Sequence, residues 1–451
     1  MTTSKTEIWP EGVTHETDQY PPAVGAGDWV FLSGQMAVDD DGDIAKKARV
    51  APEFPYYESG HTLQSKYILD QIEAIATDAG GSIDDIVRIY QWWEAPAEDQ
   101  AWLDANGWTS HSITRYLEQL YGDYIVDKSP GSTGMGVKGL KGEDRILMVD
   151  GMLHTGDAEK SAVSTVPDIP QPDADYSEVV EKGGFVFTAG EVPTDFVGDW
   201  GVSELKTDRS PDPHSTHLSA VAPEARTNPY LWYGDEIRNH TEYTLEKLDA
   251  IVQEIDTPLE NTVKAEVYLP DPTDFVGFEE IWTEWFPENP PARIVAPHQG
   301  LGLKGNRIEI ALQLVHPEAD IDVEHISTDD APSQVTHQPQ AVRAGDLLFI
   351  SGQMAIDESG QPMSESGAQA QMSEILDNTA AICEAAGTSL DNVVSTKCFY
   401  ADLSDYVGAM EALTARFDEG NRPANIPMEV GNPLLVPGCD VLVDAVAYVP
   451  E

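Results

Sequence analysis

The chain has 451 residues, with 79 Asp and Glu against 26 Lys and Arg, so its formal net charge at pH 7 is −53. This charge argues against nucleic-acid binding, which needs a basic face to contact the phosphates. The acidic residues are spread over the whole length and 41% of all residues are hydrophobic, which favours a folded protein adapted to molar salt over a disordered chain. At about 100–200 residues a domain, the length predicts two or three units.

Neither a membrane segment nor a cysteine-based site is expected. No apolar run reaches the roughly 18 residues of a membrane helix, and the opening MTTSKTEIWPEG lacks the apolar core of a signal peptide. Cys383, Cys398 and Cys439 have no metal-type spacing and are expected to be core residues in a reducing compartment. The sequence therefore predicts a soluble, cytoplasmic protein without a metal site.

The first unit opens with AVGAGDWVFLSGQ at residues 23–35, where glycine turn residues precede alternating large apolar residues, as in a hairpin with a half-buried strand. Apolar residues at intervals of three and four predict an amphipathic helix over 68–79. The later elements of this unit are a strand in SIDDIVRIYQWW (82–93), a second helix over 113–121 and a closing strand in RILMVDGML (145–153). A polar insertion at 40–60 predicts a surface loop.

The same order of elements recurs twice. In the second unit it comprises VVEKGGFVFTAGE (179–191), a helix over 245–255, PLENTVKAEVYL (258–269), a helix over 275–286 and RIEIALQLV (307–315), with a polar insertion at 195–233. In the third it comprises AVRAGDLLFISGQ (341–353), a helix over 372–386, SLDNVVSTKCFY (389–400), a helix over 406–417 and DVLVDAVAYV (440–449).

This order predicts an α+β fold of three units, each a mixed sheet with two helices on one face. Pro- and Asp-rich linkers divide the chain into units at 1–158, 172–316 and 333–451. Tandem copies of one unit commonly pack around an axis, so we expect an intrachain pseudo-trimer that acts as a monomer or forms a low-order homo-oligomer.

The repeated frame resembles the Rid family of YjgF-type reactive-intermediate deaminases, and the resemblance covers nearly the whole chain three times. It is most specific at SGQMA (33–37 and 351–355), AAGTSLDNVV (385–394) and PPAR (290–293). The resemblance implies chorismate-mutase-like units with ligand clefts at the interfaces between them. It also implies hydrolysis of 2-imino or enamino acids to 2-keto acids and ammonia, without a metal or organic cofactor.

The resemblance further implies a set of site residues. In the family, the Arg of the PAR motif holds the substrate carboxylate and a Glu on the last strand handles water, while a Tyr and the Ser of SGQ complete the pocket. The matching positions in this chain are Arg293 and Glu309 as catalytic residues and Tyr176, Tyr20, Ser33 and Ser351 as substrate-binding residues. A bidentate guanidinium suits a carboxylate, and a carboxylate can orient and deprotonate water.

The other copies depart from this pattern. The Arg position holds Ser132 and Asn425, the Glu position holds Met148 and Leu442, the third Tyr position holds Gln338, and the second Ser position holds Ala189. The second unit alone keeps both Arg and Glu, so the sequence predicts at most one competent cleft.

Each candidate also has a structural interpretation. Arg293 is compatible with an ion-pair role, Glu309 with a solvated surface acid, the tyrosines with packing, and the serines with a tight bend. His298 invites a general-base role, but a surface loop position is the simpler expectation. Lys264 and Lys397 suggest the Ser–Lys pairs of three-repeat cyanuric-acid-hydrolase-type enzymes, against which Arg88 on the corresponding strand argues. The tryptophans of the first unit, Trp92, Trp93, Trp102 and Trp108, favour core or inter-unit packing over a ligand pocket.

Two hypotheses of function remain. The first is a 2-iminobutanoate/2-iminopropanoate deaminase-type hydrolase with one working cleft, in which Arg293 holds the carboxylate and Glu309 positions water. The second is a non-catalytic relative that binds a small carboxylate metabolite or a protein partner, as the loss of site residues in two units suggests. A changed activity on another ligand in the same cleft is a third possibility.

Overall fold

The computed structural model describes the chain apart from residues 1–4, 16, 18, 52–59, 96–120, 126–127, 170–174, 195–220, 223–224, 226–234, 302–305, 358, 364–366, 432 and 451. Most of the helix expected over 113–121, most of the insertion at 195–233, and Trp102 and Trp108 lie outside the described residues.

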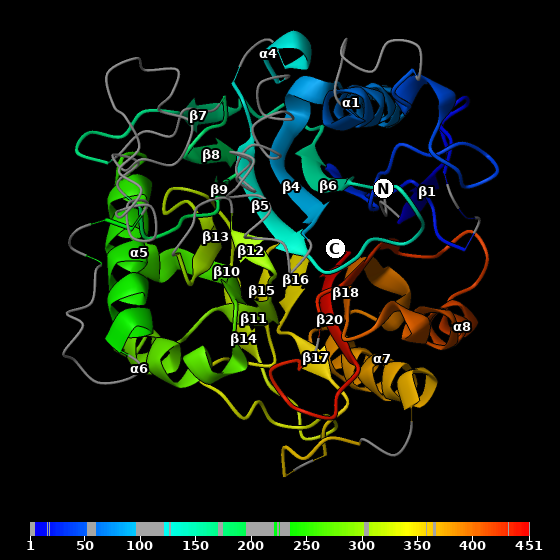
Figure 1. Ribbon diagram of the computed structural model, residues 1–451. Coiled ribbons are helices and arrows are strands. Elements are labelled where there is room, and N and C mark those ends of the chain that lie inside the picture. Colours follow the sequence, from blue (N-terminus) through cyan, green and yellow to red (C-terminus); the bar gives the residue numbers. More distant parts are fainter. Residues whose placement is uncertain are drawn as a thin grey trace, which may run out of the picture.

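The described strands form three sheets, one for each unit (Figure 1). The first sheet has the order β1-β2-β3-β6-β4-β5-β12, with β1 Thr6–Ile8, β2 Ala23–Ala26, β3 Trp29–Leu32, β4 Ile86–Glu94, β5 Gly131–Val137 and β6 Leu147–His154. Its last strand, β12 (Gly300–Leu301), comes from the second unit and pairs with β5. The helices of this unit are α1 (Gly60–Asp78) and the short α4 (Tyr121–Tyr124).

The second sheet has the order β11-β10-β13-β9-β8-β7, with β7 Ser161–Val163, β8 Val179–Lys182, β9 Phe185–Thr188, β10 Thr262–Leu269, β11 Ala292–Pro297 and β13 Glu309–Val315. The third has the order β14-β15-β16-β20-β18-β19, with β14 Val323–Ile326, β15 Ala341–Ala344, β16 Leu347–Ile350, β18 Val393–Tyr400, β19 Ala424–Glu429 and β20 Val441–Tyr448, while β17 (Gln353–Met354) pairs with β20. The edge strands β7 and β14 precede residues 172 and 333, where the sequence places the starts of these units.

Each sheet carries its helices on one outward face (Figure 1). The second unit has α5 (Asp235–Gln253) and α6 (Phe275–Trp285), and the third has α7 (Gly367–Ala385) and α8 (Tyr406–Arg416). Three hydrophobic cores, one for each unit, lie between a sheet and its helices. The predicted α+β class with three YjgF-type units is therefore confirmed.

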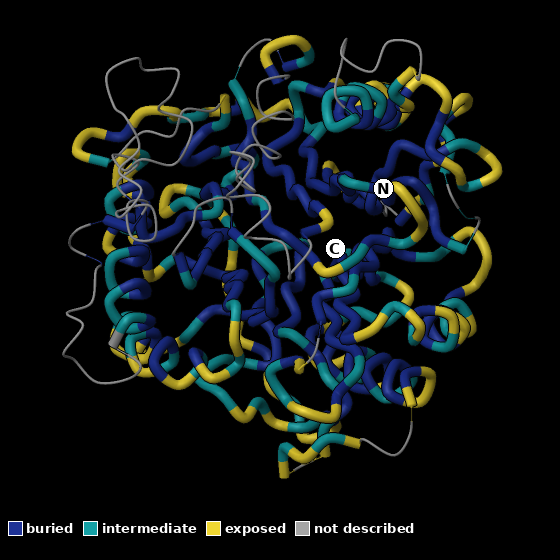
Figure 2. The backbone as a smooth tube through the Cα atoms, in the orientation of Figure 1, coloured by how far each residue is buried: buried dark blue, intermediate teal, exposed yellow. Residues whose placement is uncertain are grey.

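The opposite faces of the sheets meet at the centre of the molecule, where the strands are buried (Figure 2). Two further hydrophobic clusters there combine residues from all three units. A backbone hydrogen bond links the units in a closed cycle, because Gly34 donates to the carbonyl of Asn425 (3.1 Å), Gly190 to that of Ser132 (2.9 Å) and Gly352 to that of Arg293 (2.9 Å).

The centre also holds charged residues, which we call the core ion cluster. Glu266 contacts Arg88 at 3.1 Å and Lys397 at 3.2 Å, and Lys264 pairs with Asp444. Lys397 lies 3.6 Å from Asp150, which accepts a 2.6 Å hydrogen bond from the indole of Trp92. The cluster thus comprises three cations and three carboxylates, all buried: Arg88, Lys264, Lys397, Asp150, Glu266 and Asp444.

The pKa shifts of the cluster follow from burial and partners. Burial alone would raise the pKa of Glu266, but Lys397 and Arg88 outweigh it and lower that pKa to about 2. Burial raises the pKa of Asp150 to about 6 in spite of Lys397. Glu266 therefore carries its charge at neutral pH and depends on two cations from two other units.

Removing one partner of the Lys264–Asp444 pair is expected to destabilise the protein more than removing both. Lys264→Met leaves a buried carboxylate short of a cation, which costs about 3–5 kcal/mol, whereas Lys264→Met with Asp444→Leu should recover most of that loss. Denaturant unfolding at fixed salt measures both, with the exposed Glu254→Gln as control. A single variant as stable as the control would show that the pair contributes nothing.

Candidate functional site

The cyclic hydrogen bonds define three junctions between units, and the strand register shows which residues are equivalent in them. Ser132, Arg293 and Asn425 each follow the first residue of a parallel strand, and they pair with Ile89, Ala265 and Thr396. We name each junction by its units: junction 1–2 contains Ser132, junction 2–3 contains Arg293 and junction 3–1 contains Asn425.

Arg293 is fully buried between β11 and α6, at junction 2–3. Its Nη2 forms a 2.7 Å ion pair with Glu279 of α6, and its Nε donates a 3.0 Å hydrogen bond to Gln338 of the third unit. The rings of Phe278 and Trp282 lie 5.1 and 5.0 Å from the guanidinium carbon. Burial lowers the pKa of Arg293 to about 10 although Glu279 opposes this, so the group is charged at neutral pH.

Glu309 lies elsewhere, and the prediction of one cleft containing both Arg293 and Glu309 is wrong. Arg293 pairs with Ala265, whereas Glu309 pairs with Tyr268. Because Ala265 and Tyr268 are three residues apart on one strand, the two side chains lie on opposite faces of the sheet.

Glu309 belongs to junction 1–2, where it is 4% exposed and is therefore not a solvated surface acid. Its carboxylate lies directly against Gly190, where a Cβ would collide with it and would also meet Thr133 of the first unit. The equivalent glycines, Gly34 and Gly352, face Met148 and Leu442 in the same way. Junction 2–3 thus combines the Arg with Leu442, and junction 1–2 combines the Glu with Ser132.

The two SGQ serines connect neighbouring units and do not line the Arg293 pocket. Ser351 Oγ donates to the carbonyl of Pro339 (2.7 Å) and accepts from the backbone N–H of Arg293 (3.1 Å). Ser33 Oγ donates to the carbonyl of Pro21 (2.5 Å) and accepts from the N–H of Asn425 (3.0 Å). Each hydroxyl therefore fixes the strand that carries the Arg position of the preceding unit in the cycle.

The two predicted tyrosines reach across to neighbouring units. Tyr20 is fully buried in the helix-side core of the third unit, with its ring 5.0 Å from that of His15. Tyr176 is partly buried against the helix-side core of the first unit. At junction 2–3 this position is Gln338, the hydrogen-bond partner of Arg293. Neither tyrosine therefore belongs to the same site as Arg293.

A cavity of about 250 Å³ opens at junction 2–3. Arg293 lines it from the second unit, and Gln338, Gln353 and Asn378 add amide groups from the third. Most of the wall is apolar: Phe275, Val276, Val295, Met354, Ile356, Leu435, Val436 and Leu442. No Asp, Glu or His is among the described lining residues. The site therefore offers one cation and several amides in an apolar enclosure, which suits recognition of a small anion more than acid–base chemistry.

His298, expected at the surface, is 4% exposed at the end of β11, and this expectation is wrong. Burial lowers the pKa of His298 to about 3, and neither ring nitrogen has a hydrogen-bond partner among the described residues. Sequence reasoning missed its burial because the adjoining residues PHQG are polar and turn-like.

The remaining candidates have structural positions. Lys264 and Lys397 pair with carboxylates in the core ion cluster, and Trp92 and Trp93 are fully buried. Within the described ranges, no group of His, Cys, Asp and Glu could hold a metal ion. None of the described helices combines the length and apolar character needed to span a bilayer.

The connecting role of Ser351 predicts the behaviour of Ser351→Ala. The variant leaves the buried N–H of Arg293 without its acceptor, which costs about 1–3 kcal/mol of unfolding free energy. Denaturant unfolding checks this, with the exposed Ser359→Ala as a control that removes only a local turn contact to Asp357. Unchanged stability would contradict the assignment.

Comparison with known proteins places these features in a family. Residues 218–315 and 328–449 match the family described as Endoribonuclease L-PSP. The RutC family protein PH0854 of Pyrococcus horikoshii is 33% identical over 125 residues, which cover 28% of this chain and 97% of that protein. The 2-iminobutanoate/2-iminopropanoate deaminase of Mus musculus is 31% identical over 122 residues, covering 27% of this chain and 88% of that protein.

A similar solved structure is RidA from an Antarctic Psychrobacter species, with 35% sequence identity, a TM-score of 0.26, and coverage of 28% of this chain and 99% of that one. Each relative thus corresponds in length to a single unit. Because the RutC family protein PH0854 is matched at 33% identity over 97% of its length, and the family model matches the second and third units, the chain belongs to the Rid family, to which the names YjgF and RutC also refer.

Proposed function

We propose that this protein binds a small carboxylic acid with a short apolar side chain, such as a 2-keto acid, in the cavity at junction 2–3. The observation that carries the proposal is the buried, charged Arg293 at the wall of a mainly apolar 250 Å³ cavity, to which Gln338, Gln353 and Asn378 add neutral amides. A guanidinium can hold a carboxylate through two parallel hydrogen bonds, and the interaction is strong where water is excluded.

Arg293 has bonding capacity left for a ligand. Its Nη1 has no hydrogen-bond partner among the described residues, and its Nε is held by the neutral amide of Gln338. A ligand carboxylate can displace that amide, since Gln338 itself lines the cavity. Glu279 remains on Nη2, so the bound state has one guanidinium between two carboxylates, and Phe278 and Trp282 cover the stacked cation.

Hydrolytic deamination of 2-imino acids is a second candidate function. The relatives from Mus musculus and Rattus norvegicus that carry the name 2-iminobutanoate/2-iminopropanoate deaminase favour it. Hydrolysis needs a group that orients and deprotonates water. At junction 2–3 the family's acid position is Leu442, and Glu309 faces another junction, so binding is better supported than rapid turnover.

Calorimetric titration with 2-ketobutanoate tests the binding proposal. Arg293→Lys, which keeps the charge but loses the planar fork, should weaken binding about tenfold or more. The control is Arg238→Lys, which alters an exposed ion pair with Glu280. Because a buried variant can affect folding, the wild-type protein is also titrated with 2-ketobutanamide, which lacks the carboxylate. Equal affinity for acid and amide, or no binding of the acid, would overturn the proposal.

Installing the missing acid should create hydrolysis where Arg293 already lies. Leu442→Glu places a carboxylate beside Gly352, and it should raise hydrolysis of 2-iminobutanoate formed in situ by about 100-fold or more. Leu442→Gln is the matched control, because it has the same shape without a basic oxygen. Wild-type turnover already as fast as that of Leu442→Glu would instead favour the deaminase function.

A further inference from the structure

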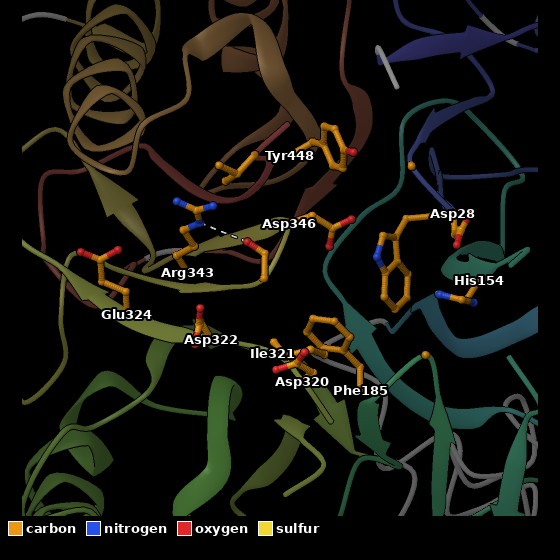
Figure 3. A pocket seen from close by; sticks show the side chains of 15 residues that line it. Asp28, His154, Phe185, Asp320, Ile321, Asp322, Glu324, Arg343, Asp346 and Tyr448 are labelled. Atoms are coloured by element: carbon orange, nitrogen blue, oxygen red, sulfur yellow. Dashed lines mark hydrogen bonds between the residues drawn. The ribbon is translucent and has the colours of Figure 1, made fainter. Parts of the chain in front are cut away.

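A second and larger cavity, of about 840 Å³, lies where the hairpin turns of the three units meet (Figure 3). The turns are equivalent, and each has a glycine with positive φ: Gly27 (59°), Gly183 (66°) and Gly345 (57°). These glycines all line the cavity, and no residue lines both this cavity and the one at junction 2–3. We call it the hairpin cavity.

Aromatic side chains from the three units form part of its wall. Trp29, Phe185 and Tyr448 all line the hairpin cavity and all belong to the hydrophobic cluster shared by the three units. The rings of Trp29 and Phe185 meet edge to face at 5.2 Å. All three side chains are buried in the shared cluster, and aromatic faces attract cations as well as apolar groups.

The rest of the lining is strongly acidic. Its carboxylates come from two hairpin turns and from the segment that joins the second and third units: Asp28, Asp346, Asp320, Asp322 and Glu324. The one Lys or Arg among the described lining residues is Arg343, whose Nε donates to the carbonyl of Gly345 (3.0 Å). Figure 3 shows these acids around the cavity rather than on one side. The lining therefore has an excess of four negative charges.

His154 supplies an observation that is independent of the acids. It lines the hairpin cavity, is only 7% exposed, and stacks edge to face on Trp29 at 4.6 Å. Its Nδ1 has no hydrogen-bond partner among the described residues. Burial, and then Lys182, lower the pKa of His154, so the imidazole is neutral near pH 7 and can accept a hydrogen bond.

These features do not suit a single metal ion. Within the described ranges, no His, Cys, Asp and Glu residues are grouped closely enough to hold one. Carboxylates distributed around a cavity of this size instead match a ligand with several separated positive charges, and the aromatic wall matches methylene groups between those charges. A linear polyamine has both properties.

We propose that the hairpin cavity binds a small linear polyamine, whose ammonium groups pair with the acidic lining and whose methylene chain lies against Trp29, Phe185 and Tyr448. This site is separate from the carboxylate site at junction 2–3 and does not depend on it.

Titration of the full chain with spermidine at fixed high KCl tests the proposal, by calorimetry and by the intrinsic tryptophan fluorescence, to which Trp29 contributes. Asp28→Asn combined with Asp322→Asn should weaken spermidine binding about tenfold or more, because two charge-assisted hydrogen bonds are lost. The matched control, Glu254→Gln with Glu419→Gln, removes the same charge at exposed positions away from the cavity and should change the affinity less than about twofold.

The outcomes are decisive in either direction. Selective loss in the first double variant, with an unchanged thermal midpoint, supports the site. Equal loss in both double variants would mean that spermidine responds only to the overall acidic surface, and this would overturn the proposal. Absence of binding to the wild-type chain, or displacement of spermidine by Mg²⁺ at equal concentration, would also overturn it.

Discussion

The core ion cluster is the interaction on which the arrangement of the three units depends. Glu266 of the second unit is held by Arg88 of the first and Lys397 of the third, and Lys264 of the second pairs with Asp444 of the third. Buried charges are tolerated only when they are paired and hydrogen-bonded. Each unit supplies one cation and one carboxylate, but every one of these ion pairs joins two different units, so the charges are paired in the buried centre only when the three units pack together.

Such a cluster cannot form in a trimer of identical subunits. Tyr90, Glu266 and Lys397 occupy one equivalent position, because each pairs with the third residue of its parallel neighbour strand, at Thr133, Ile294 and Ile426. In a trimer of identical subunits this position would carry three like charges or none. Because the units are joined, a tyrosine, a glutamate and a lysine can occupy the three equivalent positions at the centre. There the Tyr90 hydroxyl donates a 2.6 Å hydrogen bond to Glu266.

The same freedom explains the separation of the family's site residues. The Arg survives at junction 2–3 and the acid at junction 1–2. At junction 3–1 the Arg position is Asn425, whose amide donates to Thr396 Oγ1 at 2.9 Å and thus has a packing role. In a homotrimer a change at one position alters all three sites together, whereas here each junction can change alone. Under the proposed function, junction 2–3 can bind a carboxylate with Leu442 in place of the acid, and this replacement does not alter the other two junctions.

Much of the fold followed from the sequence, since glycine turns, alternating strands and helical periodicity are local signals. The sequence did not show which residues meet at each junction, because this depends on which unit is the neighbour. Arg293 and Glu309 are close in sequence and belong to one repeat, so they suggested one site. Only the register of β11 and β13 on β10 shows that they face opposite sides. The buried lysines were equally hidden, since a lysine on an apolar strand is usually expected at an edge and its carboxylate partner lies in another unit.

The two proposed ligands, a carboxylate and a polyamine, have opposite charges, and salt screening explains how one highly acidic chain could bind both. At an ionic strength of about 1 M the Debye length is about 3 Å, so exposed carboxylates act only on groups that touch them. The acids of the hairpin cavity would then contribute through direct contact, and the net charge of −53 would not keep a small anion away. Arg293 is shielded from solvent altogether, so its attraction for a carboxylate is screened far less than that of a surface arginine. The two proposed sites are compatible with each other, because neither relies on the long-range field of the protein.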